Sequence, residues 1–256
     1  MNIKSAYHYQ VSENTKAIIS FYIIVTIVLL SLFACFGITY SSEEGPLNSG
    51  NFGGMEMSSM IFLLVVGISS FKDSFSMLQQ NGISRKTFFI SHIYTSITIT
   101  LIMAAIDTLL SLIFKAFTEL LGLFHYYSMY EQLYTNSAFG RGSIIYSIIG
   151  YFFNFSLYLS ILAVGYFIRL VYYRLGKPGT TMLSVFVPIF FTLILPIFDS
   201  KVTNGKIYTS FVKLLDNAFG ITSQQPVNTI ITCLLAFMLL SIFSWLLTRK
   251  AVLKDK

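Results

Sequence analysis

The sequence predicts an all-α protein that spans a membrane six times, and two observations support this prediction. First, the chain is 55% hydrophobic and only 11% charged, whereas about 25% of the residues of a soluble domain are charged. Second, six long apolar runs are spread from one end of the chain to the other. Because so little polar surface cannot face water on every side, we expect one membrane domain over residues 1–256 and no soluble domain beside it.

The apolar runs have the lengths of membrane-spanning helices. A helix needs roughly 20 apolar residues to cross a hydrocarbon core of ~30 Å. The second run is the shortest, so we expect its helix to continue through Met77 and Leu78. Pro188 and Pro196 are expected to kink the fifth span, because proline breaks the helical hydrogen-bond ladder. The predicted spans are about 18–38, 57–71, 88–114, 143–168, 180–198 and 227–247.

Basic residues predict the orientation of these spans, because loops rich in Lys and Arg stay in the cytoplasm. With the N-terminus inside, 12 of the 17 basic residues fall on the inner side, and the outer loops hold five basic residues and seven of the 11 acids. Both termini are therefore expected in the cytoplasm, and the chain in a cell membrane, expected to be a bacterial plasma membrane. The inner basic residues are Lys4, Lys16, Lys72, Arg85, Lys86, Arg169, Arg174, Lys177, Arg249, Lys250, Lys254 and Lys256.

Three segments outside the spans have helical character. Ile3, Tyr7 and Val11 recur every four residues, which predicts an amphipathic helix on the inner membrane surface before the first span. Lys115 and Glu119 are spaced to pair on a helix that continues beyond the third span. Residues 206–219 present an apolar face, which favours a short helix that either lies in the outer leaflet or packs on the protein's own spans.

Two polar side chains inside the predicted spans, Asp107 and Asn154, are candidates for a functional role. Asp107 is expected near the outer interface, where it reaches water or a base such as Lys115; lining of a transport path is the alternative role. Asn154 lies mid-span and would need a hydrogen bond to another helix, which favours a structural role over a ligand site.

The residues that catalysis would need are scattered or missing. The chain has no P-loop glycine pattern, no nucleophile elbow and no pair of histidines at zinc-ligand spacing. The net charge of +6 is not gathered into a patch that would track phosphates, so nucleic acid is not expected as a partner. We therefore expect no catalytic residue, cofactor site or metal site in this chain.

The segment 72–90 between the second and third spans is the most informative stretch. Phe71, Phe75 and Leu78 fall on one side of a short amphipathic helix. Asn81-Gly82 is expected to end this helix, because glycine adopts the left-handed conformation that terminates helices. A short rigid helix exposed between two spans is suited to docking in a groove of a cytoplasmic partner.

The stretch from Asn81 to Phe89, Asn-Gly-Ile-Ser-Arg-Lys-Thr-Phe-Phe, resembles the segment that follows the coupling helix in ABC-transporter permeases of the second exporter type. The six-span architecture with both ends inside is similar over the whole chain. The resemblance implies that the helix at 72–80 and the turn behind it contact an ATPase. The residues implied in that coupling are Lys72, Asp73, Phe75, Leu78, Gln79, Asn81, Gly82, Arg85 and Lys86.

The resemblance also implies the rest of the assembly. Two permeases, identical or related, would bind two cytoplasmic ATP-binding-cassette ATPases, which would hold ATP and magnesium. Spans one, two and five would line the path between the permeases, and lipid would surround them. The chain lacks the large outer domain of the lipid- and antibiotic-linked subtypes, which argues against those subtypes. The aromatic-rich lining of the path favours an amphipathic or hydrophobic cargo, such as an antimicrobial or toxin-like peptide or a lipophilic drug.

Two other functions remain open from the sequence. The first is a non-transport membrane protein, such as a bacteriocin-immunity or peptide-sensing subunit, whose binding energy would concentrate in the outer loops. The second is an ion-coupled carrier, which needs polar groups near the middle of the bilayer. Because Asn154 is the one such group that the sequence indicates, the carrier ranks last.

Overall fold

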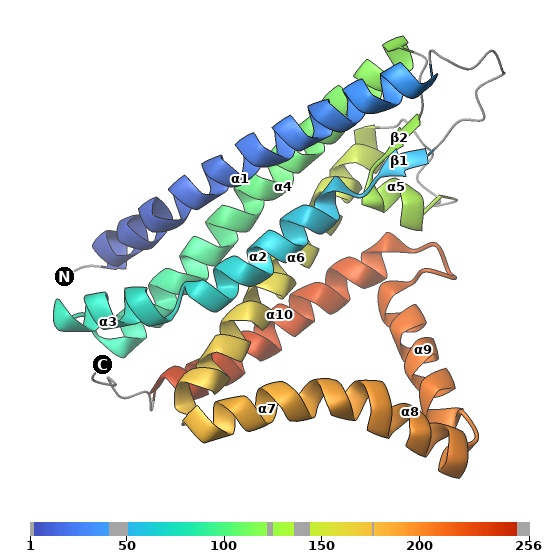
Figure 1. Cartoon of the computed structure of the whole chain (residues 1–256). Helices are drawn as coiled ribbons and strands as arrows, with labels where there is room; N and C mark the ends of the chain where they lie inside the picture. The colour runs from blue at the N-terminus through green and yellow to red at the C-terminus, as the bar shows by residue number, and fades with distance from the viewer. Residues whose placement is uncertain (1–2, 41–50, 122–124, 136–143, 176, 250–256) are drawn as a thin grey trace.

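A computed structural model describes residues 3–40, 51–121, 125–135, 144–175 and 177–249 of the chain as a helical bundle (Figure 1). Six of its helical segments are long and apolar enough to cross a membrane, as the sequence predicts. The segments are Ile3–Leu32, Met55–Gln80, Arg85–Leu120, Ile144–Arg174, Pro178–Lys201 and Pro226–Arg249.

The first helix, α1 (Ile3–Tyr40), is continuous over 38 residues. The predicted surface helix is therefore not a separate element, because its residues form the first turns of α1. These turns are fixed to α4 (Arg85–Leu121) by polar contacts: the Gln10 amide donates to the Ser91 hydroxyl at 3.2 Å, and Thr95 donates to Gln10 at 3.2 Å. Farther along, Tyr22 reaches Met103 on the same helix, so α1 and α4 run side by side in parallel.

The second predicted span forms α2 (Met55–Ser69). The expected continuation through Met77 and Leu78 is a separate helix, α3 (Lys72–Gln80), which follows a break at Ser70 and Phe71. This confirms that a short helix separates the second and third spans. In Figure 1, α3 and both described chain ends lie at the same end of the bundle. At this end, called the α3 end below, Arg85 Nη1 donates to the carbonyl of Arg249 at 2.9 Å and so ties α4 to the last helix.

The opposite end carries a small β ladder, which an all-α prediction does not include. Strand β1 (Asn51–Gly53) pairs in parallel with β2 (His125–Tyr127), and Phe52 lies opposite Tyr126. The short helix α5 (Met129–Leu133) follows, and a capping box between Ser128 and Glu131 fixes its first turn. The ladder connects the segment that precedes α2 with the segment that follows α4. Strands of three residues are too short for the alternating pattern by which a strand is recognised in a sequence.

The fourth span, α6 (Ile144–Arg174), is the most buried span and packs against α2, α4 and α10 (Pro226–Arg249). Its closest crossing is with α2, where Gly67 and Gly165 face one another. A Cβ atom on either glycine would overlap a backbone carbonyl of the other helix, that of Leu162 or Leu64. Small residues at a crossing let two membrane helices approach closely, and this crossing uses that property.

The fifth span leaves the bundle and changes helix type along its length. It comprises α7 (Lys177–Ile189), η1 (Phe190–Ile194), α8 (Leu195–Phe198) and η2 (Asp199–Thr203), of which η1 and η2 are π-helical. The interruption after Pro188 fits the prediction that prolines disturb this span. Residues 206–219 form the predicted helix, α9 (Lys206–Phe219), which leads back to α10. None of the residues in α9 is buried, and its last residue, Phe219, packs against the bundle core.

Candidate functional site

The helix α3 is stopped by a glycine motif that fixes its end. Gly82 has a φ of 75°, the N–H of Gly82 donates to the Gln79 carbonyl at 3.0 Å, and the N–H of Ile83 donates to the Leu78 carbonyl at 3.0 Å. This pair of hydrogen bonds is the Schellman motif, which ends a helix in a defined direction. Ser84 then caps α4 by accepting from the Thr87 N–H at 3.1 Å. The end of α3 at Asn81-Gly82 was predicted from the sequence.

An aromatic cluster anchors α3 to the spans around it. The side chains of Phe71 and Phe75 are 0% and 1% exposed, and the Phe75 ring packs edge-on against Phe88 of α4 with centroids 5.3 Å apart. Phe71 also contacts Tyr166 and Tyr173 of α6. Leu78, Ile83, Phe89, Leu170 and Ala6 complete the cluster. A displacement of α3 would therefore act directly on α4 and α6, because close-packed side chains transmit strain.

The residues that the resemblance implies in coupling fall into a buried group and an exposed group. Phe75 and Leu78 face the protein's own core, so they are not available to a partner surface. Asn81, Gly82, Arg85 and Lys86 are exposed, and Gln79 is partly buried and donates to the Ile83 carbonyl at 2.9 Å. The side chains of Lys72 and Asp73 lie outside the part of the chain that the structure describes.

A buried carboxylate occupies the interior of the bundle. Asp107 on α4 is 0% exposed, accepts a hydrogen bond from Tyr22 of α1 at 2.9 Å and accepts a second one from Tyr158 of α6. The expectation that Asp107 reaches water or Lys115 is wrong, because two tyrosine hydroxyls close over it. The predicted pair of Lys115 and Glu119 is also wrong, because Lys115 instead pairs with Glu131 of α5 at 2.8 Å.

A second buried carboxylate, Glu56, was not identified from the sequence. It lies in the first turn of α2, where the sequence suggested only an acid of an outer loop, and its side chain is 0% exposed. One carboxylate oxygen accepts from Ser111 of α4 at 3.4 Å, and the other has no hydrogen-bond partner among the described residues. The hydrophobicity of the sequence could not show that Glu56 is buried in the bundle, because Glu56 is only the second residue of α2 and so lies at the edge of the apolar run.

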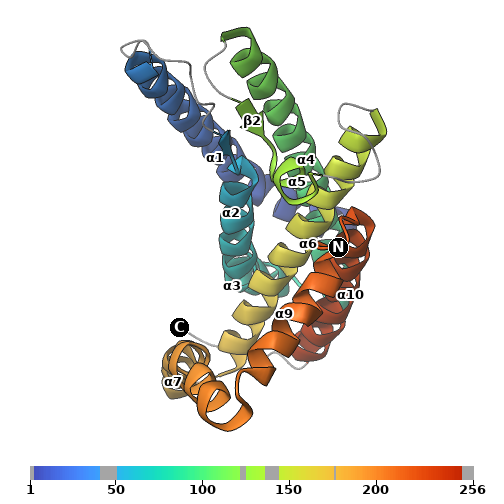
Figure 2. The same ribbon diagram turned by 90° about the vertical axis from the view of Figure 1, so that its right-hand side faces the viewer.

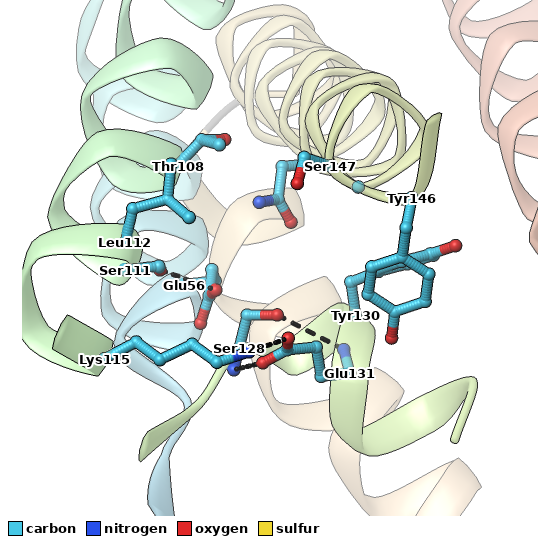
Figure 3. Close-up of a pocket in the computed structure, with 12 residues that line it drawn as sticks. Glu56, Thr108, Ser111, Leu112, Lys115, Ser128, Tyr130, Glu131, Tyr146 and Ser147 are labelled. Atoms are coloured by element: carbon cyan, nitrogen blue, oxygen red, sulfur yellow. Dashed lines mark hydrogen bonds and ion pairs between the residues drawn. The ribbon is translucent and has the colours of Figure 1, made fainter. Parts of the chain in front are cut away.

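Glu56 lines a cavity between α2, α4, α5 and α6 (Figure 3). The cavity has a volume of about 60 Å³. Figure 3 shows Glu56 and Ser111 on one side, with the pair of Lys115 and Glu131 beside Ser128. The remaining lining residues are Thr108, Leu112, Tyr130, Tyr146, Ser147, Gly150 and Asn154.

Asn154 differs from its expected role in the fourth span. Its side chain is 4% exposed, and its amide oxygen has no hydrogen-bond partner among the described residues. The sequence predicted that Asn154 would form a hydrogen bond to another helix, and its amide oxygen forms no such bond within the part of the chain that the structure describes. Because an unpaired buried acceptor costs roughly 1–3 kcal/mol, the oxygen of Asn154 is a group to which a ligand could bind.

The tyrosine contacts of Asp107 can be tested by stability. Tyr158→Phe removes one donor and leaves the carboxylate buried, so we expect the free energy of unfolding to fall by about 1–3 kcal/mol. Tyr94→Phe is the matched control: Tyr94 lies on α4 and is 57% exposed, so its side chain lies on the outer surface of the bundle and away from Asp107. Unfolding in mixed detergent micelles measures both variants. Equal stability of the two variants would contradict a role of Tyr158 in holding Asp107.

Three comparisons with known proteins were made. No protein-family model, no characterised protein and no solved structure matches this chain.

Proposed function

We propose that this chain is the membrane-spanning permease subunit of an ABC exporter of the second type. The observation that supports this proposal most strongly is α3, a nine-residue helix held between two spans at the end of the bundle where both described chain ends lie. The Schellman turn and the aromatic cluster hold α3 firmly, so a displacement of α3 would be passed to the helices around it. The sequence of its turn supports the same reading, because it resembles the segment behind the coupling helix of that family.

The exposed side of α3 is the surface that an ATPase would bind. Met77 is 44% exposed, and Gln80, Asn81 and Gly82 are exposed beside it. The buried side, with Phe75 and Leu78, would transmit motion and would not form the contact. In this proposal ATP and magnesium bind to the partner ATPase, and closure of the ATPase dimer displaces α3. The displacement then passes to α4 and α6 through the aromatic cluster defined above.

The arrangement of the spans supports a pair of permeases. In Figure 2, α2 and α7 of spans two and five lie on the left-hand side of the bundle, and α1 of span one runs from behind its centre to the upper left. The most apolar stretch of the fifth span has no buried residue. A second copy of this chain, or a related permease, would cover this side and enclose the path, and lipid would cover the rest. The apolar and aromatic side chains there suit an amphipathic or hydrophobic cargo, such as a peptide or a lipophilic drug.

Photo-crosslinking tests the docking surface directly. A photoreactive amino acid at Met77, introduced in the native host, is expected to form a covalent adduct with an ATP-binding-cassette ATPase. The yield should change when ATP hydrolysis is blocked with vanadate, because the ATPase would then hold α3 in one position. The same label at Leu120 is the matched control, since this residue is 85% exposed and lies at the opposite end of α4.

Two outcomes would contradict the proposal. One is an adduct of Met77 with proteins that contain no nucleotide-binding motif, or with none at all. The other is an ATPase adduct that forms equally from Leu120. An immunity or peptide-sensing protein would give the first outcome, and its peptide would instead crosslink near the β1–β2 end.

A further inference from the structure

We propose that the cavity between α2, α4, α5 and α6 is a binding site for a small monovalent cation, held by the Glu56 carboxylate and the Asn154 amide oxygen. This inference does not depend on the exporter proposal, because the cavity is lined by residues of α5, and α5 lies beside β1 and β2 and away from α3 (Figure 1). A partner ATPase is not needed to test it.

The unpaired groups of the cavity are both hydrogen-bond acceptors. Oε2 of Glu56 and Oδ1 of Asn154 have no hydrogen-bond partner among the described residues, and both side chains are at least nine-tenths buried. They come from different spans, α2 and α6, and both line the cavity. Carboxylate and side-chain amide oxygens are ligands that hard cations use. Both oxygens are therefore available as ligands for a cation bound in the cavity.

The cavity lining contains two carboxylates, Glu56 and Glu131, and one basic side chain, Lys115. Lys115 pairs with Glu131, and no basic side chain in the described part of the chain forms an ion pair with Glu56. Asp107 adds a further negative charge that acts on Glu56. A charge buried among membrane helices is costly unless it is paired. The tyrosines donate to both oxygens of Asp107, whereas Oε2 of Glu56 has no hydrogen-bond partner in the described part of the chain.

The composition and size of the site favour a monovalent cation. A divalent ion such as calcium takes six to eight oxygen ligands with several carboxylates, and the described residues contain no group of three His, Cys, Asp or Glu side chains that could hold a metal. The cavity volume of about 60 Å³ is enough for a cation with a few waters, since one water needs roughly 10–15 Å³. Hydroxyls of Ser111, Ser147 and Thr108 line the same space and could complete the shell.

Two sources supply this chemistry: an inorganic ion such as sodium or potassium, and the primary ammonium group of an organic molecule. Both carry one positive charge on a small centre. The test separates them. The full-length chain, purified in detergent, is heated in N-methylglucamine chloride, whose cation is too bulky for the cavity. Sodium, potassium or methylammonium chloride then replaces it at constant ionic strength, and the melting temperature Tm is followed.

At a hundredfold excess over Kd, a bound cation is expected to raise Tm by roughly 5–10 °C, and the rise should saturate. A response to sodium or potassium assigns an inorganic ion, and a response to methylammonium alone assigns an organic ammonium group. Glu56→Gln keeps the shape and removes the charge, so it should abolish the response. Asn154→Leu removes the second oxygen and should weaken the apparent affinity about tenfold.

Glu119→Gln is the matched control, because Glu119 is an exposed carboxylate on α4 and lies outside the cavity; it should keep the full response. Folding of each variant is checked by its elution as a single species and by Tm in N-methylglucamine chloride. A Tm that is the same in all four salts would overturn the proposal. So would a cation response that survives in Glu56→Gln. A carboxylic-acid infrared band lost in Glu56→Gln, with no cation effect, would show that a proton alone neutralises Glu56.

Discussion

Replacing Gly165 with alanine is expected to destabilise the bundle, although alanine favours a helix by about 1 kcal/mol over glycine. The added Cβ would overlap the carbonyl oxygen of Leu64 and lie 3.2 Å from the Cα of Gly67. Because both contacts are with backbone, the two helices must separate. Overpacking of this kind costs typically about 1–3 kcal/mol, so the net result should be a lower free energy of unfolding. Gly165→Leu should cost more, since its whole side chain enters the crossing.

Gly179→Ala is the matched control for this crossing. Its Cβ would meet only the flexible side chain of Leu175, at 3.3 Å, so the helix preference of alanine should leave stability unchanged or higher. Unfolding in mixed micelles measures both variants. Gly67→Ala should resemble Gly165→Ala, and the double variant should cost less than the sum of the two, because the first Cβ already separates the helices. Additive effects would contradict a shared contact.

Replacing Phe75 with alanine should be the second large effect. The ring is 1% exposed, and it packs against Phe71 and Phe88 at the junction of α3 and α4. Emptying a fully buried phenylalanine site costs about 3–5 kcal/mol through lost burial and the cavity left behind. We expect a lower Tm and faster proteolysis within residues 72–84, since α3 would lose its anchor.

Met77→Ala is the control on the opposite side of the same helix, because Met77 is 44% exposed. Its stability should stay within about 0.5 kcal/mol of the parent chain. The two variants also separate anchoring from docking: Met77→Ala should weaken a partner contact without loosening α3, whereas Phe75→Ala should loosen α3 first. If Phe75→Ala and Met77→Ala unfold at the same temperature, the anchoring role of the cluster is wrong.

The number of spans and the form of the loop between the second and third spans were predictable from the sequence. Span length and apolar content are local properties, since each spanning helix satisfies its own backbone hydrogen bonds. The end of α3 also depends on neighbouring residues alone. Gly82 adopts a positive φ at little cost, and Ser84 provides the cap of the next helix. The position of both termini in the cytoplasm stays a prediction from the basic residues.

The burial of particular side chains was decided only by the tertiary structure. A helical stripe such as Phe71, Phe75 and Leu78 identifies an apolar face but not what covers it, and here α4 and α6 cover the face expected to meet a partner. Glu56 and Asp107 lie 51 residues apart in the sequence, and only the packing of α1, α2, α4 and α6 places both inside. The sequence by itself determined the elements that cross the membrane, because their periodicity is local. The tertiary structure decided which polar groups face one another, because that depends on how separate helices cross.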